Sequence, residues 1–189
     1  MDINNYILTT SNLSVGYSSK KVTNTIASNI NLTLKKGELI ALIGANGIGK
    51  STLLRTLIGI QPPLSGNVIL NGKNISDYNS ISFAQNLSIV LTEKLPPSNL
   101  TVFEIIALGR QPYTNWLGKL SENDISKINE AMELTQINSL ADKKHYEISD
   151  GQLQTVLVAR ALAQDTPLII LDEPTTHLDL LHKVSLFKL

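Results

Sequence analysis

The sequence of 189 residues contains no cysteine, no excess of charge and no long apolar run. Without cysteine the chain can form neither disulfides nor thiolate metal sites, which fits a reducing compartment. Its 16 Lys and Arg residues balance its 16 Asp and Glu residues, so net charge draws it neither to nucleic acid nor to an anionic membrane. The N-terminus lacks the basic start and apolar core of a signal peptide, and no apolar run approaches a membrane span. We therefore expect a soluble cytoplasmic protein that meets a membrane only through partners.

The sequence does contain a P-loop motif in an α/β setting. Residues 39–43 (LIALI) form a short apolar run, typical of a buried parallel strand. The spacing G-x-x-x-x-G-K-S follows at once, with Gly44, Gly49, Lys50 and Ser51 at its fixed positions. Residues 51–58 (STLLRTLI) then predict a helix that begins where the loop ends. The alternative is a glycine-rich turn followed by a helix-capping serine.

The residue types of this motif suit a polyphosphate. Gly44, Gly47 and Gly49 let the backbone turn so that successive N–H groups point at anionic oxygens. The start of the helix adds further donors and the positive end of its dipole. We expect Lys50 to reach the β and γ phosphates and the Ser51 hydroxyl to bind Mg²⁺.

Two segments ahead of the P-loop, residues 6–17 and 26–35, are rich in β-branched and apolar residues and predict an antiparallel β layer. In the second segment, apolar and polar residues alternate from Ile30 to Lys35, as in a strand with one wet face. Tyr17 stands at the end of the first segment. Its ring could stack on an adenine, which needs only a flat apolar face, or it could pack at the strand end. The residues themselves leave both roles open.

Helices are expected further along the chain, in residues 95–146. Thr101 and Glu104 spell a T-x-x-E capping box that opens one helix. A second helix is predicted after Ser121, where Ile125, Ile128 and Met132 recur at helical spacing. Residues 147–164 predict a third, amphipathic helix, capped by Ser149 and Gln152. Its apolar face comprises Leu153, Val156, Leu157 and Ala161.

A second buried strand is predicted at Leu168–Leu171 (LIIL), and it ends in Asp172 and Glu173. Acids at this place suit a nucleotide site. Asp172 would hold Mg²⁺ through water, and Glu173 is the candidate general base for the attacking water. The alternative is an acidic turn at a strand end.

These motifs together resemble the ATP-binding subunit of ABC transporters. GANGIGKST is similar to the family's Walker A motif, ISDGQ to its signature, LIILDEP to its Walker B motif and THLD to its D-loop. Residues 100–113 (LTVFEIIALGRQPY) are similar to importers of the iron-siderophore, haem or cobalamin type. The resemblance implies an α/β fold, a RecA-like P-loop NTPase core with an N-terminal antiparallel β layer and an inserted helical subdomain. The β layer and first part of the core would occupy residues 1–94, the helical subdomain 95–146, and the signature helix, Walker B strand and D-loop 147–189.

The resemblance also implies an ATPase that works with ATP and Mg²⁺. Two ATPase subunits would meet head to tail around ATP. They would be either two copies of this chain or one copy and a different ATPase subunit. Ser149, Gly151 and Gln152 would then contact the γ-phosphate across the dimer. The Walker A match adds Asn46 and Thr52 to the binding residues, and it favours Tyr17 as the adenine-stacking ring. Integral membrane permease subunits would hold the chain at the inner face of the cell membrane.

The chain also departs from the family pattern. Asp150 replaces a usual glycine, Leu153 replaces a usual basic residue, and Thr92 and Glu93 stand where a Q-loop glutamine is expected. The switch histidine of the family is missing. Of the three histidines, His177 lies in the D-loop, and His145 and His182 are expected at the surface. We therefore expect a C-terminally truncated chain.

Two functions follow from this pattern. The chain is either an ATPase subunit that energises import of a metal chelate or related cofactor, or a truncated relic or regulator that binds MgATP without efficient hydrolysis. A third possibility, a soluble ABC ATPase acting on DNA or ribosomes, is disfavoured by the balanced charge.

Overall fold

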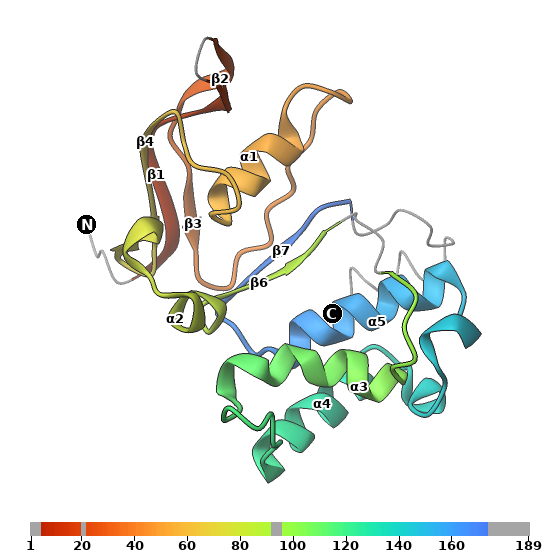
Figure 1. The fold of residues 1–189 in the computed structure, drawn as a ribbon. Helices are drawn as coiled ribbons and strands as arrows, with labels where there is room; N and C mark the ends of the chain where they lie inside the picture. Colours follow the sequence, from red (N-terminus) through yellow and green to blue (C-terminus); the bar gives the residue numbers. More distant parts are fainter. Residues whose placement is uncertain (1–4, 20–21, 92–95, 174–189) are drawn as a thin grey trace. The chain divides into compact units, whose positions relative to one another are not determined.

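The structure is a computed structural model that describes residues 5–19, 22–91 and 96–173 (Figure 1). The chain divides into two compact units, an N-terminal unit, Met1–Asn86, and a C-terminal unit, Leu87–Leu189. The parts predicted at 1–94, 95–146 and 147–189 divide the chain by role, and that division stays a prediction.

An antiparallel sheet dominates the N-terminal unit (Figure 1). Its strands are β1 (Tyr6–Ser18), β2 (Thr23–Ile30), β3 (Thr33–Lys35), β4 (Ser65–Leu70) and β5 (Lys73–Asn74). β1 is central and pairs with β2, β3 and β4, and β5 extends the sheet beyond β4. Leu8 on β1 lies opposite Leu34 on one side and Leu70 on the other. The predicted antiparallel layer is confirmed, although residues 31–32 interrupt the second predicted strand.

Two helices and a 3-10 turn complete the part of this unit that the structure describes. Helix α1 spans Lys50–Leu57 and buries Leu53 and Leu57, η2 spans Ile75–Asp77, and α2 spans Ser80–Ala84. The helix predicted at 51–58 is thus confirmed within one residue at each end.

The apolar run ahead of the P-loop is not a strand. Residues 38–45 adopt no regular secondary structure, and Leu39 and Ile43 are 86% and 88% exposed. The buried parallel strand predicted at 39–43 is therefore wrong. A buried strand needs a hydrogen-bonded neighbour and cover on both faces. None of the described strands of the N-terminal unit pairs with this run.

The C-terminal unit contains a parallel pair of strands, β6 (Leu87–Val90) and β7 (Leu168–Leu171). Leu87 lies opposite Leu168 and Val90 opposite Leu171. Val90 packs in one buried cluster with residues of the helix that precedes β7, namely Leu157, Val158 and Ala161. The strand predicted at 168–171 is confirmed.

The described part of the C-terminal unit also contains helices α3 (Val102–Ala107), α4 (Glu122–Leu134) and α5 (Asp150–Ala163) (Figure 1). The 3-10 turns η3 (Leu108–Tyr113), η4 (Asn138–Leu140) and η5 (His145–Glu147) connect them. Their shared core includes Val102, Ile105, Ile106, Ile128, Met132, Val156 and Ala159. The helices predicted after Thr101 and Ser121 are confirmed, and so is the Thr101–Glu104 capping box. In the described part of the chain, no helix is both long and apolar enough to cross a membrane.

Candidate nucleotide site

The P-loop runs directly into helix α1. Gly49 is the N-cap of α1 and has a φ of 107°, and Gly47 has a φ of 78°. Residues other than glycine rarely adopt such backbone angles. A Cβ at Gly49 would also overlap Cγ2 of Ile26 on strand β2. The loop therefore requires glycine at Gly49 for its angle and for its space.

Lys50 folds back over the loop that precedes it. Its Nζ donates to the carbonyl oxygens of Gly44 and Ala45, at 2.9 Å each. These acceptors are neutral, whereas phosphate oxygens are charged and accept more strongly from an ammonium group. Oxygens of a bound anion can therefore replace the two carbonyls as acceptors of the Lys50 hydrogen bonds.

The start of α1 is not neutralised by the helix itself. In α1, all of whose residues are described, the first turn carries no acidic residue, and Gly49 offers no side-chain cap. The positive end of the helix dipole therefore faces the loop without a carboxylate of α1 beside it. The backbone, Lys50 and the dipole all favour an anion here, so the residues fit the predicted polyphosphate.

Tyr17 lies beside this helix. Its hydroxyl is 3.2 Å from the Thr52 hydroxyl on the first turn of α1, and its side chain is 52% exposed. The structure therefore brings Tyr17 to the P-loop helix, as an adenine-stacking ring requires. The contact also suits a ring that packs at a strand end, and its binding role stays a prediction.

The signature segment begins helix α5. Ser149 is the N-cap, its N–H donates to Oε1 of Gln152 at 3.0 Å, and the Gln152 N–H donates to Oγ of Ser149 at 3.2 Å. The predicted capping box is confirmed. It uses acceptor atoms of both side chains, so the hydroxyl hydrogen of Ser149 and the amide hydrogens of Gln152 are the donors they can offer to an anion. Together with Gly151, these residues keep their predicted role as a proposal.

The acidic pair follows strand β7. The Asp172 N–H donates to the carbonyl of Val90 at 2.9 Å, which continues the β6–β7 ladder by one residue. Asp172 is buried, whereas Glu173 is exposed and has a φ of 50°. A positive φ is uncommon in a residue with a side chain. The chain thus turns sharply directly after the predicted metal ligand.

The predicted site residues fall into two groups. Tyr17 and the P-loop residues belong to the N-terminal unit, and the signature segment, Asp172 and Glu173 belong to the C-terminal unit. Among the described residues, no three His, Cys, Asp or Glu side chains gather as a metal site. The roles of Ser51 and Asp172 as ligands of Mg²⁺ therefore stay predictions.

Several predicted residues lie outside the described part of the chain. These are Thr92 and Glu93 at the Q-loop position, the D-loop residues 176–179 with His177, and His182.

His145 is buried and not at the surface as expected. It is 8% exposed, its Nδ1 accepts from the Ser98 N–H at 3.2 Å, and its own backbone N–H donates to the Leu100 carbonyl at 2.9 Å. The backbone pairing of Thr101 with Lys144 draws this histidine inward. The polar residues around His145 in the sequence gave no periodic signal of this pairing.

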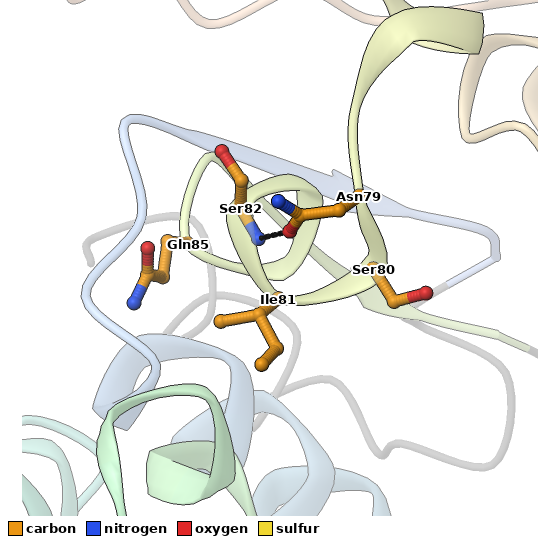
Figure 2. Close-up of a pocket in the computed structure, with 5 residues that line it drawn as sticks. All are labelled: Asn79, Ser80, Ile81, Ser82 and Gln85. Atoms are coloured by element: carbon orange, nitrogen blue, oxygen red, sulfur yellow. Dashed lines mark hydrogen bonds between the residues drawn. The ribbon is translucent and has the colours of Figure 1, made fainter.

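A hollow of about 480 Å³ lies at helix α2. Figure 2 shows its lining residues, Asn79, Ser80, Ile81, Ser82 and Gln85. The Asn79 side chain accepts from the Ser82 N–H at 2.8 Å and so caps α2. The lining contains no charged residue and none of the predicted site residues, so the nucleotide site rests on the loop geometry instead.

The loop, its lysine and the adjoining helix define a P-loop nucleotide-binding protein. Residues 27–176 match the family model described as ABC transporter. The chain belongs to the ABC transporter family, which confirms the family and fold predicted from the motifs.

Individual relatives agree with this family. The chain is 44% identical over 180 residues to an uncharacterised ABC transporter ATP-binding protein of Methanocaldococcus jannaschii. It is 38% identical over 182 residues to the iron(3+)-hydroxamate import ATP-binding protein of Bacillus subtilis. These alignments cover 95% and 96% of this chain but 61% and 66% of the two relatives.

The fold is also similar to a solved dimeric ATP-binding cassette in a post-hydrolysis state with ADP and phosphate. The TM-score is 0.79 at 26% identity, over 96% of this chain and 80% of that one.

Proposed function

We propose that the chain is the ATP-binding and ATP-hydrolysing subunit of an ABC importer for an iron-siderophore, haem or cobalamin. One observation carries the nucleotide site: the Lys50 ammonium group donates to the Gly44 and Ala45 carbonyls at the start of α1. The Bacillus subtilis relative, named for iron(3+)-hydroxamate import, supports the substrate class.

The P-loop residues would hold ATP in distinct ways. Gly44, Asn46, Gly47 and Gly49 would contribute backbone N–H donors to the phosphates. Lys50 would exchange its two carbonyl acceptors for β and γ phosphate oxygens, because charge-assisted bonds are stronger. Thr52 would also contact the bound nucleotide, and Tyr17 would stack on its adenine.

Hydrolysis needs an activated water and compensation of phosphate charge. Glu173 would accept a proton from water as its oxygen attacks the γ phosphorus and the bond to the ADP oxygen breaks. Ser51 and Asp172 are the proposed ligands of Mg²⁺, which supplies positive charge to the phosphates when bound. Lys50 adds a second positive charge there.

The partners follow from the proposed role. A second copy, or a second ATPase subunit, would bring Ser149, Gly151 and Gln152 to the γ-phosphate, where the start of α5 adds its dipole. The dimeric cassette of similar fold supports this arrangement. Permease subunits would bind the chain at the inner face of the membrane. They would receive the conformational change that accompanies ATP hydrolysis.

Nucleotide affinity tests the binding site. Lys50→Ala should abolish magnesium-dependent ATP binding in equilibrium titration, because the loop loses its only lysine. Lys36→Ala removes the same charge from an exposed turn of the same unit and serves as the matched control. Equal affinities for the Lys50→Ala chain and the control would overturn the binding proposal.

Phosphate release tests the enzymatic step. Glu173→Gln should reduce steady-state phosphate release to background while ATP still binds, because an amide cannot take up the proton. Glu133→Gln changes an exposed carboxylate on α4 and is the control. Equal rates in wild type and Glu173→Gln would remove the enzymatic role from this chain.

A second function, MgATP binding without efficient turnover, is supported by a specific observation. Residues 39–43 lead into the P-loop but are exposed and belong to no described strand. A loop that is not anchored by a buried strand can bind phosphate, yet hydrolysis demands placement within about 1 Å. ATP binding with no release of phosphate above the Glu173→Gln background would favour this function.

A further inference from the structure

Arg110 forms a buried polar junction within the C-terminal unit. It lies in η3, with a side chain that is 3% exposed. Its Nε donates to Oδ1 of Asp124 on α4 at 2.8 Å. Its Nη1 donates to the carbonyl of Ala163, the last residue of α5, at 2.9 Å. The guanidinium carbon also lies 4.0 Å from the ring centre of Tyr113. One side chain therefore connects η3, α4 and the end of α5.

Arginine suits this place for a physical reason. The last carbonyls of a helix have no partner within the helix and carry the negative end of its dipole. Nη1 of Arg110 reaches two of these carbonyls, since the Gln164 oxygen is also within 3.4 Å. The planar guanidinium group can serve the carbonyls and Asp124 at the same time, whereas a lysine ammonium is a single point.

Asp124 is itself held in place. The hydroxyl and the N–H of Ser121 donate to Oδ2 of Asp124, at 2.6 and 2.9 Å. Burial raises the pKa of Asp124, but the Ser121 hydrogen bonds and Arg110 together lower it below its usual range. The carboxylate thus stays charged and fixes the orientation of the guanidinium group.

The neighbouring residue Gly109 fixes the same end of α5 by contact. A Cβ at Gly109 would overlap the carbonyl oxygen of Arg160 and lie 3.3 Å from its carbonyl carbon. The backbone of η3 therefore lies directly against the last turns of α5. Most residues in this half of α5 are themselves buried, namely Val156 to Ala159, Ala161 and Ala163.

The opposite end of α5 carries the signature segment. The helix has 14 residues. It is therefore about 21 Å long. A tilt of about 5° about its fixed end would move the Ser149 end by about 2 Å over that length. Small errors at Arg110 are thus enlarged at Ser149.

We propose that Arg110 is a positioning residue: by joining the last carbonyls of α5 to Asp124 on α4, it sets the direction of α5 and thereby the place of Ser149 and Gln152. The consequence for catalysis rests on the proposed function, whereas the direction of α5 is a property of the folded chain. The two can therefore be measured separately.

The test compares Arg110→Lys with the wild type. Lysine keeps the charge but cannot serve Asp124 and both carbonyls together. Because the chain contains no cysteine, spin labels can be placed by Glu133→Cys on α4 and Gln154→Cys on α5, and their distance distribution measured in the full chain. Ile128→Val, which trims a buried α4 residue outside the junction, is the control. The fraction folded is checked by urea unfolding in each case.

The expected result is a shifted or broader distance distribution in Arg110→Lys and an unchanged one in Ile128→Val. ATP affinity should stay as in wild type, while turnover at saturating ATP falls about tenfold to a hundredfold, the size expected for a misplacement near 1 Å. A distribution equal to that of wild type or of the control would overturn the proposal. If wild type shows no turnover, the proposed function fails and the distance measurement still decides. Asp124→Asn provides a second variant should Arg110→Lys not fold, with the same expected shift.

Discussion

Gly49→Ala is the sharpest test of the P-loop geometry. Gly49 is the N-cap of α1, and its φ of 107° lies in a region that L side chains rarely adopt. Its Cβ would in addition overlap Cγ2 of Ile26. Alanine thus creates two separate penalties, one in the backbone and one in the packing.

The two penalties can be separated in size by a matched glycine. Gly72 has a φ of 79°, and a Cβ added there would meet nothing within 4 Å, so Gly72→Ala carries the backbone penalty without the clash. A positive φ costs an L residue about 1–2 kcal/mol. Overpacking costs about 1–3 kcal/mol. We therefore expect Gly49→Ala to lower the free energy of unfolding by about 2–5 kcal/mol, and Gly72→Ala by about 1–2 kcal/mol.

The assay is urea unfolding followed by circular dichroism, with ATP affinity measured on the folded variants. Ile26→Ala removes Cγ2, so in a double-mutant cycle it should recover about 1–3 kcal/mol of the Gly49→Ala loss. ATP affinity should fall with Gly49→Ala and not with Gly72→Ala. Equal stability losses at both glycines, with no coupling to Ile26, would refute the close approach of the P-loop to β2.

Two further predictions concern Asp124 and Tyr17. The pKa of Asp124 lies below its usual range, because hydrogen bonds from Ser121 and the charge of Arg110 outweigh the effect of burial. Its stabilisation is therefore present above the unfolded pKa of about 3.9 and lost as pH falls through the lower folded value. Acid unfolding curves should show this loss in wild type and not in Asp124→Asn; identical curves would contradict it. Tyr17→Phe keeps the ring but loses the Thr52 contact, so ATP affinity should change less than about threefold, whereas Tyr17→Ala should weaken it about tenfold. Equal affinities of Tyr17→Ala and wild type would remove the stacking role.

The buried Arg110–Asp124 pair shows how a costly feature can be useful. Burying two charges is expensive, and a well-packed apolar pair is often at least as stable. Removing one partner is nevertheless strongly destabilising, by about 3–5 kcal/mol, because the other charge stays buried and unpaired. We therefore expect this pair to favour one arrangement of η3, α4 and α5 over others.

Local sequence was sufficient for most helices and strands. The capping boxes at Thr101 and Ser149 act within four residues, so their spacing is readable before the fold is known. The P-loop spacing placed α1 within one residue at each end, because glycine angles and a helix start are local properties. Strand β7 was predicted from its run of four apolar residues, which is also a local property.

Contacts between residues far apart in the chain could not be predicted from the sequence. The run at 39–43 is apolar enough for a buried strand, but a strand exists only where a neighbour accepts its hydrogen bonds. His145 is buried because its backbone meets Leu100, 45 residues earlier, and nothing in its own neighbourhood signals that meeting. Arg110 likewise finds its carbonyl at Ala163, 53 residues further along the chain.

The sequence by itself thus determined the motifs, the caps and the family, since each depends on residues a few positions apart. Only the tertiary structure decided that Tyr17 meets Thr52 and that Arg110 joins α4 to α5. These contacts depend on where separate segments come together in space, and short-range spacing carries no record of it.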